Sequence, residues 1–217
     1  MKIISPDQVG LVIPVKIATF NEFLTSNLPQ PQYKNTQVLL EFTVESNKEV
    51  FLGDYVNYLI ENKVYVLLMT QEGNSSFYAK EITDFHLMTI ELTVSDSAVT
   101  TYEFKKFGQI PLNENKILYT IANVQQELKE NQPLFILFDS LSDLVLWLDF
   151  TVTYKLIRKC MSTLRRRKNT SSLFLINKTS HNSEIISSFE TLFDVVILSD
   201  AVNEARMLGV PKSRHLI

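Results

Sequence analysis

Short runs of apolar residues alternate along the chain with stretches in which apolar positions recur every three or four residues. Continuous apolar runs predict strands buried on both faces, and they lie at 37–42, 64–69, 133–138, 172–176 and 195–198, with a further strand near 87–94. Helical periodicity predicts helices with one buried face, at 48–62, near 75–84, at 117–128, as one long helix through 147–164, and at 183–192. A strand-like or irregular segment is expected at 100–107, and a last, antiparallel strand at 205–210.

This order of elements predicts an α/β fold with a mostly parallel central sheet and helices on both faces. The length of 217 residues suits one domain, and neither a repeat nor a linker rich in Gly, Ser or Pro divides it. We therefore expect a single domain over 1–217, with an N-terminal segment at 1–36 and the core at 37–217. Five glycines in the whole chain are few for such a fold.

The composition is that of an ordinary globular protein, with 45% hydrophobic and 21% charged residues and a net charge of −3. This balance gives no general attraction to nucleic acid. The lone Cys160 lies in an apolar-periodic stretch, where a buried thiol in a reducing compartment is the usual case. The most apolar span, 134–152, contains three aspartates, which favours a protein core over a membrane segment. The N-terminus lacks the apolar run of a signal peptide, so we expect a cytoplasmic chain.

A basic run, 165–168, closes the predicted long helix. It suits the negative end of the helix dipole. Binding of a partner through this run is the less favoured alternative.

Four segments in a fixed order carry a resemblance to a known family. The segment 39–72, LLEFTVESNKEVFLGDYVNYLIENKVYVLLMTQE, resembles the start of a KaiC-type ATPase core, with strand, phosphate loop, helix, second strand and acidic pair. The family's N-terminal turn is similar to 20–29 (FNEFLTSNLP), its Walker B strand to 134–141 (LFILFDSL), and its closing strand to 205–215 (ARMLGVPKSRH). The resemblance implies a RecA-like three-layer fold of archaeal type, with ATP and Mg²⁺ as the family's ligands.

The phosphate loop departs from the family's G-x-x-x-x-G-K-[ST] pattern. The matching run, 42–49, reads FTVESNKE, and only Lys48 matches a defining position. In the intact loop, the glycines let backbone N–H groups wrap the phosphates and the hydroxyl binds Mg²⁺. Here Phe42 and Asn47 replace the glycines, and Glu49 replaces the hydroxyl residue. By resemblance, Ser46, Asn47, Lys48 and Glu49 would face a nucleotide, but we expect tight Mg-ATP binding in the usual pose to be lost.

The other family positions are also mixed. Gln71 and Glu72 stand where hydrolysing relatives carry two glutamates that orient water, so Glu72 and Gln71 are the candidate catalytic residues. Asp139, followed by Ser140, matches the Walker B aspartate that holds Mg²⁺ when nucleotide binds. An equally weighted alternative is that Asp139 starts a turn or caps a helix with Ser140 and Ser142.

Two basic residues near the C-terminus complete the resemblance. Lys212 and Arg214 match the element that, in ring-forming relatives, reaches the nucleotide of a neighbouring subunit; a solvated tail is at least as good an interpretation. The three histidines lack the spacing of zinc ligands.

Three functions remain open. The favoured one is a non-catalytic RecA/KaiC-like regulatory or assembly module, whose partner is an active RecA/KaiC-like paralogue or a second copy of the chain. The second is a weak or unconventional ATP binder that uses Lys48, Glu72, Asp139 and Arg214. The third, a recombination-accessory paralogue, would need basic and aromatic loops, and the expected loops at 140–146 and 177–183 offer one lysine and no aromatic residue. We expect neither membrane nor nucleic acid as a partner.

Overall fold

A computed structural model describes residues 35–44, 48–78, 85–94, 107–201 and 204–208. Its strands are β1 (Gln37–Phe42), β2 (Tyr65–Gln71), β3 (Leu87–Thr93), β4 (Phe107–Pro111), β5 (Leu134–Asp139), β6 (Thr170–Asn177), β7 (Val195–Ala201) and β8 (Glu204–Leu208). Its helices are α2 (Lys48–Glu61), the 3₁₀ turn η3 (Ser75–Phe77), α3 (Glu114–Glu127), α4 (Leu141–Leu148), α5 (Phe150–Leu164) and α6 (Ser183–Glu190).

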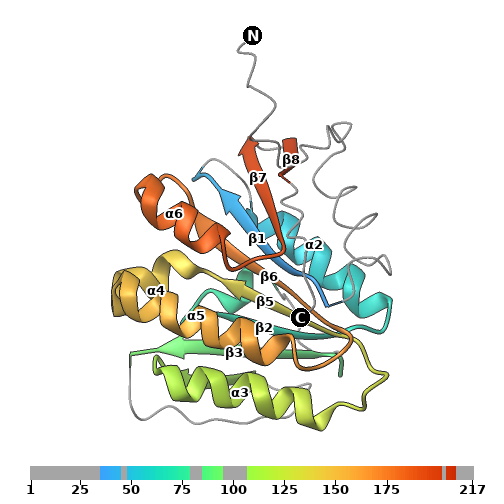
Figure 1. Cartoon of the computed structure of the whole chain (residues 1–217). Coiled ribbons are helices and arrows are strands. Elements are labelled where there is room, and N and C mark those ends of the chain that lie inside the picture. Colours follow the sequence, from blue (N-terminus) through green and yellow to red (C-terminus); the bar gives the residue numbers. More distant parts are fainter. Residues whose placement is uncertain (1–34, 45–47, 79–84, 95–106, 202–203, 209–217) are drawn as a thin grey trace, which may run out of the picture.

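The strands form one sheet in the order β4-β3-β2-β5-β6-β1-β7-β8 (Figure 1). Every neighbouring pair from β4 to β7 is parallel, and β8 runs antiparallel to β7 with Val196 opposite Leu208. The α/β class and the parallel sheet predicted from the apolar runs are therefore confirmed. Within the described ranges, none of the helices has the length and apolar character needed to span a membrane.

Helices cover both faces of the sheet, and each face has its own hydrophobic core. Leu39 and Phe138 belong to the core under α3, α4, α5 and α6, where the rings of Phe138 and Phe174 stack at 5.2 Å. The residues that directly precede these two, Val38 and Leu137, belong to the other core, under α2. This alternation explains the unbroken apolar runs, because both sides of each strand are buried.

The predicted long helix through 147–164 is wrong in one respect, since the structure divides it at Asp149. This residue has φ 67° and ψ 167°, outside the helical region, and separates α4 from α5. Its carboxylate accepts the Val152 N–H at 2.9 Å and so caps the N-terminus of α5. The apolar period continued across the break because both helices pack on the same face of the sheet.

One further expectation needs correction, and another is described only at its end. The helix predicted near 75–84 is, in its described part, the single 3₁₀ turn η3, and 79–84 lie outside the described residues. The strand-like segment expected at 100–107 is described only from its last residue, where β4 begins and runs to Pro111. The expectation for 100–106 stays a prediction, because those residues lie outside the described part of the chain.

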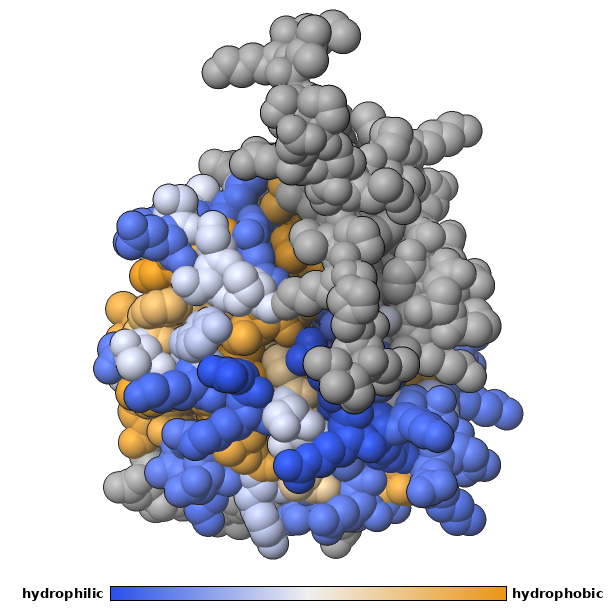
Figure 2. All heavy atoms as spheres, in the orientation of Figure 1, coloured by the Kyte–Doolittle hydropathy of each residue, from blue (hydrophilic) through white to orange (hydrophobic). Residues whose placement is uncertain are grey.

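The surface of the face seen in Figure 2 is mixed. Apolar side chains show through on the left, over the side that carries α4 and α5, and Leu146 of α4 is 79% exposed. Hydrophilic side chains cover the lower right, where the chain leaves α3 towards β5.

Candidate functional site

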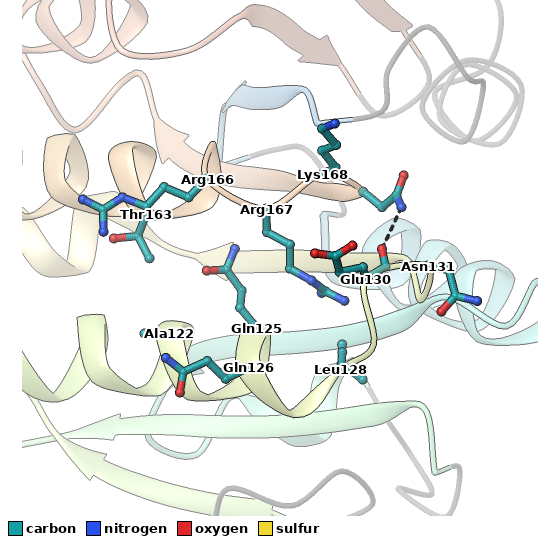
Figure 3. Close-up of a pocket in the computed structure, with 11 residues that line it drawn as sticks. Ala122, Gln125, Gln126, Leu128, Glu130, Asn131, Thr163, Arg166, Arg167 and Lys168 are labelled. Atoms are coloured by element: carbon teal, nitrogen blue, oxygen red, sulfur yellow. Dashed lines mark hydrogen bonds between the residues drawn. The ribbon is translucent and has the colours of Figure 1, made fainter.

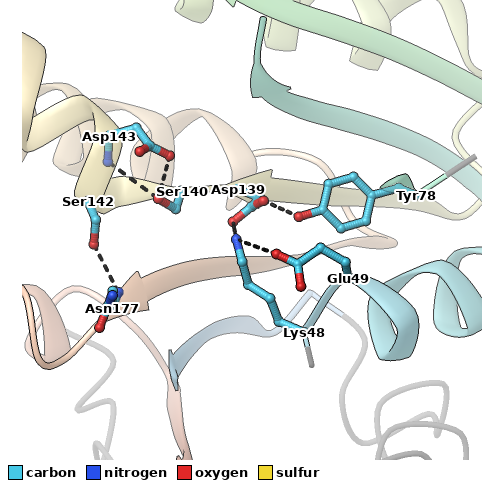
Figure 4. A network of polar contacts seen from close by, with 8 residues as sticks. All are labelled: Lys48, Glu49, Tyr78, Asp139, Ser140, Ser142, Asp143 and Asn177. Carbon is cyan, nitrogen blue, oxygen red and sulfur yellow. Dashed lines mark hydrogen bonds and ion pairs between the residues drawn. The ribbon is translucent and has the colours of Figure 1, made fainter. Parts of the chain in front are cut away.

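Lys48 and Asp139, which are 91 residues apart, meet at the carboxyl ends of the parallel strands. Lys48 is the first residue of α2, which follows β1, and Asp139 is the last residue of β5. Because β6 lies between β1 and β5, the lysine side chain reaches across one strand to make the contact. Its Nζ donates to Asp139 Oδ1 at 2.6 Å, and the aspartate is 2% exposed (Figure 4). The carboxyl ends of strands are where open α/β sheets usually bind ligands.

The lysine has two further neighbours. Its Nζ lies 4.7 Å from the centre of the Phe42 ring, within the range of a cation–π contact. Glu49 Oε1 is 3.8 Å from the same Nζ. With only 16% of its side chain exposed, Lys48 is surrounded by partners from its own chain.

Tyr78 forms a hydrogen bond with the second carboxylate oxygen of Asp139. Its hydroxyl donates a short hydrogen bond to Asp139 Oδ2 (Figure 4). The ring is 3% exposed, and burial, together with the adjacent Asp139 carboxylate, raises the pKa of Tyr78 far above its ordinary value. The phenol is therefore a permanent donor at physiological pH.

A buried carboxylate positions the turn that carries Tyr78. After β2, Gly73 turns the chain with φ 87°, a conformation that glycine adopts without strain. Glu91 of β3 accepts the Ser75 N–H at 3.3 Å and a hydrogen bond from Gln109 Nε2 at 3.2 Å. Burial alone would raise the pKa of Glu91, but these hydrogen bonds and one from Gly73 outweigh it and lower the pKa. An ionised Glu91 thus holds η3 where Tyr78 can reach Asp139.

The resulting cluster has little capacity left for a phosphate. Both Asp139 oxygens accept hydrogen bonds from protein groups, and Lys48 already faces a carboxylate, an aromatic ring and Glu49. In the described part of the chain, no group of three or more His, Cys, Asp or Glu side chains is placed to hold a metal ion. The arrangement is a satisfied, buried ion pair.

The structure brings some predicted site residues together and separates others. Lys48, Glu49 and Asp139 share the cluster, whereas Glu72 is exposed at the end of β2 and its backbone N–H bonds to Leu92 O. None of these contacts joins Gln71 or Glu72 to Lys48 or Asp139, so their predicted role as a catalytic pair stays a prediction. Four predicted residues lie outside the described part of the chain: Ser46, Asn47, Lys212 and Arg214.

Ser140, rather than Asp139, is the helix cap. Its Oγ accepts the Asp143 N–H at 3.3 Å and donates to Asp143 Oδ2 at 2.7 Å, so it begins α4. Of the alternative in which Asp139, with Ser140 and Ser142, caps a helix, the structure thus shows the cap at Ser140. The expected loop at 140–146 is almost entirely this helix, which removes it as a flexible contact for single-stranded DNA.

A second polar group lies beside the cap. Ser142 Oγ accepts the Asn177 N–H at 2.9 Å and contacts His181 Nε2 at 3.0 Å. Burial lowers the pKa of His181, which favours the neutral ring at pH 7. These contacts tie the start of α4 to the turn after β6.

Sequence reasoning missed Tyr78. It lies 61 residues from Asp139, in a segment predicted to be helical, and no local pattern marks it as a partner. The sequence shows Phe42 as a bulky residue in place of a glycine. Its contact with Lys48 depends on the path of the chain from β1 to α2, which the sequence does not give.

Comparisons with known proteins show the fold. No protein-family model matches the chain, and no curated protein matches it. Among solved structures, a Pyrococcus horikoshii protein studied as PH0250 is similar with a TM-score of 0.60 and 16% identity, over 83% of this chain and 89% of that one.

Two other solved structures from the same archaeon are similar. The KaiC-like protein PH0186 has a TM-score of 0.59 and 15% identity, over 85% of this chain and 84% of that one. The uncharacterized protein PH0321, in complex with an unknown peptide, has a TM-score of 0.58 and 13% identity, over 88% and 89%. At these identities the similarity shows a KaiC-like α/β fold and nothing about activity.

Proposed function

We propose that this chain is a non-catalytic RecA/KaiC-like module that acts through protein–protein contacts, with a degenerate phosphate loop. One observation carries the proposal: Lys48 is paired with the buried Asp139 at 2.6 Å, and Tyr78 caps the other carboxylate oxygen. The two charges that would serve phosphate and Mg²⁺ in the family's site neutralise each other here. The fold is kept while its nucleotide chemistry is replaced by an internal contact.

The cost of admitting a nucleotide supports this proposal. A phosphate that approached Lys48 would come within about 4 Å of the Asp139 charge, at a cost of about 4 kcal/mol for an effective dielectric near 20. That is roughly a thousandfold in affinity. Glu49, 3.8 Å from the same Nζ, adds repulsion of the same sign. Separating the pair would also leave a carboxylate that is 2% exposed without its cation.

The test is calorimetric titration with Mg-ATP and Mg-ADP, combined with an assay for phosphate release. We expect no binding at the Lys48 site: any heat seen with the wild-type chain at nucleotide concentrations up to about 1 mM should be unchanged by Lys48→Ala, and we expect no turnover. The decisive variant is Asp139→Asn. If Asp139 blocks the lysine, this change improves nucleotide binding; if Asp139 holds Mg²⁺ in a working site, the same change weakens it. Micromolar binding by the wild type that Asp139→Asn abolishes would refute the proposal.

A second candidate is a weak or unconventional ATP binder. The observation in its favour is that the structure places Lys48 and Asp139 side by side at the carboxyl ends of the strands, as a nucleotide site requires. For this candidate, Lys48→Ala should abolish the binding seen with the wild type. If wild type and Lys48→Ala are equally inert, this alternative is excluded.

The proposed partners are an active RecA/KaiC-like paralogue or a second copy of this chain. One of the similar structures, PH0321, was solved in complex with an unknown peptide, which is compatible with a protein-binding role for this fold. Light scattering on the purified chain, alone and mixed with such a paralogue, measures both forms of assembly. A strictly monomeric chain that forms no complex would count against the assembly role.

A further inference from the structure

A basic pocket lies at the end of the sheet opposite the Lys48–Asp139 pair. It is formed where α3 and α5 end and where β5 and β6 begin, with a volume of about 800 Å³ (Figure 3). Its cationic side chains come from the run after α5: Arg166, Arg167 and Lys168. The one acidic side chain among the residues that line it is Glu130, so the lining carries a net positive charge in a chain whose net charge is −3.

The walls of this pocket are built by specific hydrogen bonds. Arg167 Nη2 donates to Lys129 O at 2.5 Å and to Gln132 O at 3.1 Å, and Asn169 Nδ2 donates to Glu130 O at 3.0 Å. These bonds fix the loop between α3 and β5 against the loop between α5 and β6. The loop that carries Arg166, Arg167 and Lys168 is therefore held in place by these hydrogen bonds.

Two donors at the pocket have no acceptor. Gln125 Nε2 of α3 and Arg167 Nη1 are both buried without a hydrogen-bond partner in the described part of the chain. Figure 3 shows both side chains entering the space between α3 and the end of α5. Buried donors are usually paired in native proteins, and a water or a ligand in the pocket is one way to supply the missing acceptor. Burial lowers the pKa of Arg167, but a guanidinium stays charged at physiological pH.

The other cations of the basic run differ in their contacts. Arg165, just before the pocket, bonds to Leu192 O at 2.9 Å and to Asp194 Oδ1 at 3.1 Å. By contrast, the exposed side chains of Arg166 and Lys168 form no hydrogen bond or ion pair with any other described residue. Hydrogen bonds to the carbonyls of Leu192, Lys129 and Gln132, which follow α6 and α3, thus account for Arg165 and for one nitrogen of Arg167.

We propose that this pocket binds a phosphate-bearing small molecule with at least two linked phosphates. Guanidinium groups match phosphate oxygens with paired, charge-assisted hydrogen bonds, and an ammonium group adds a point charge. The volume lies in the range of small-molecule sites and exceeds the need of a single inorganic phosphate. The site is separate from the Lys48–Asp139 pair, so it does not depend on the function proposed above.

Calorimetric titration with inorganic tripolyphosphate tests the site. We expect binding by the wild-type chain that the double variant Arg166→Gln/Lys168→Gln weakens by about tenfold or more, because two charge-assisted contacts are lost. The matched control is Lys155→Gln/Arg158→Gln, which makes the same change in net charge at exposed positions of α5 outside the pocket. We expect it to change the affinity by less than about twofold. Equal affinities of the two double variants would overturn the proposal.

The variant Gln125→Leu separates a binding role from a structural one. If its buried amide donor waits for a ligand, the change weakens tripolyphosphate binding while the unliganded protein keeps or gains stability, because an unpaired buried donor is removed. Loss of stability with unchanged binding would show a structural role and refute this part of the argument. Glu130→Gln, which removes the acidic side chain, should tighten binding by about twofold or more.

The source of the phosphates is resolved by a second arm with ATP. Binding of ATP that is lost in Arg166→Gln/Lys168→Gln and retained in Lys48→Met assigns the pocket to the phosphate chain of a nucleotide. Binding of tripolyphosphate without ATP assigns it to inorganic polyphosphate. If neither compound binds and a thymidine oligonucleotide does, the small-molecule proposal is wrong.

Discussion

Replacing Lys48 with methionine tests whether its ion pair belongs to the fold or waits for a ligand. Lys48→Met keeps the length of the side chain but leaves Asp139, which is 2% exposed, with Tyr78 as its donor. Breaking a buried pair by removing one partner costs about 3–5 kcal/mol. Because Lys48 keeps 16% of its side chain exposed, we expect a loss of about 3 kcal/mol, the lower end of that range. For a chain of this size, that is a fall in Tm of roughly 6–12 °C.

The assay is urea unfolding followed by circular dichroism, in the absence of nucleotide. The matched control is Lys155→Met, which makes the same chemical change at an exposed position of α5 and should alter the free energy of unfolding by less than about 0.5 kcal/mol. A double-mutant cycle with Asp139→Asn then isolates the contact itself. We expect a coupling energy of at least about 1 kcal/mol for this pair.

If Lys48 instead serves to bind phosphate and does not stabilise the fold, Lys48→Met should leave the free energy of unfolding unchanged, because an unpaired charge contributes nothing to the fold. A loss below about 0.5 kcal/mol for Lys48→Met, equal to that of the control, would therefore refute the interpretation of a satisfied pair.

Four further predictions follow from individual side chains. Tyr78→Phe should cost about 1.5–3 kcal/mol in urea unfolding, the usual value of a hydrogen bond to a charged group. Since burial raises the pKa values of Tyr55 and Tyr78, their contribution to stability is full below the unfolded value of about 10 and falls as the pH rises above it; tyrosinate absorbance that shows both titrating before unfolding would contradict this. Burial raises the pKa of Cys160 to about 12, so iodoacetamide at about pH 8 should label only the unfolded protein, as read by mass spectrometry. Asp149→Ala should cost about 1–2 kcal/mol through loss of the α5 cap and adverse φ, whereas Asp149→Asn should cost less; equal losses would exclude this cause.

The sequence was informative wherever a residue's environment depends on its neighbours along the chain. Six apolar runs became buried strands of one sheet, because a strand covered on both faces has no polar side to show. Cys160 lies fully buried in α5, as its place in the apolar period predicted. The break at Asp149 was missed because the period records which face is buried and carries no information about the backbone angle of one residue.

The candidate site was only half accessible to the same reasoning. Lys48 and Asp139 were singled out by resemblance, since 42–49 and 134–141 are similar to the phosphate loop and the Walker B strand of KaiC-type ATPases. That they bond to each other, with Tyr78 on the second oxygen, was decided by the strand order, which brings three distant segments to one edge of the sheet. The basic pocket has the same origin: the sequence showed a basic run, but two unpaired donors meet there only because α3 and α5 end side by side. Local periodicity thus determined the elements of this protein, and the packing of those elements decided which charges are satisfied and which remain available.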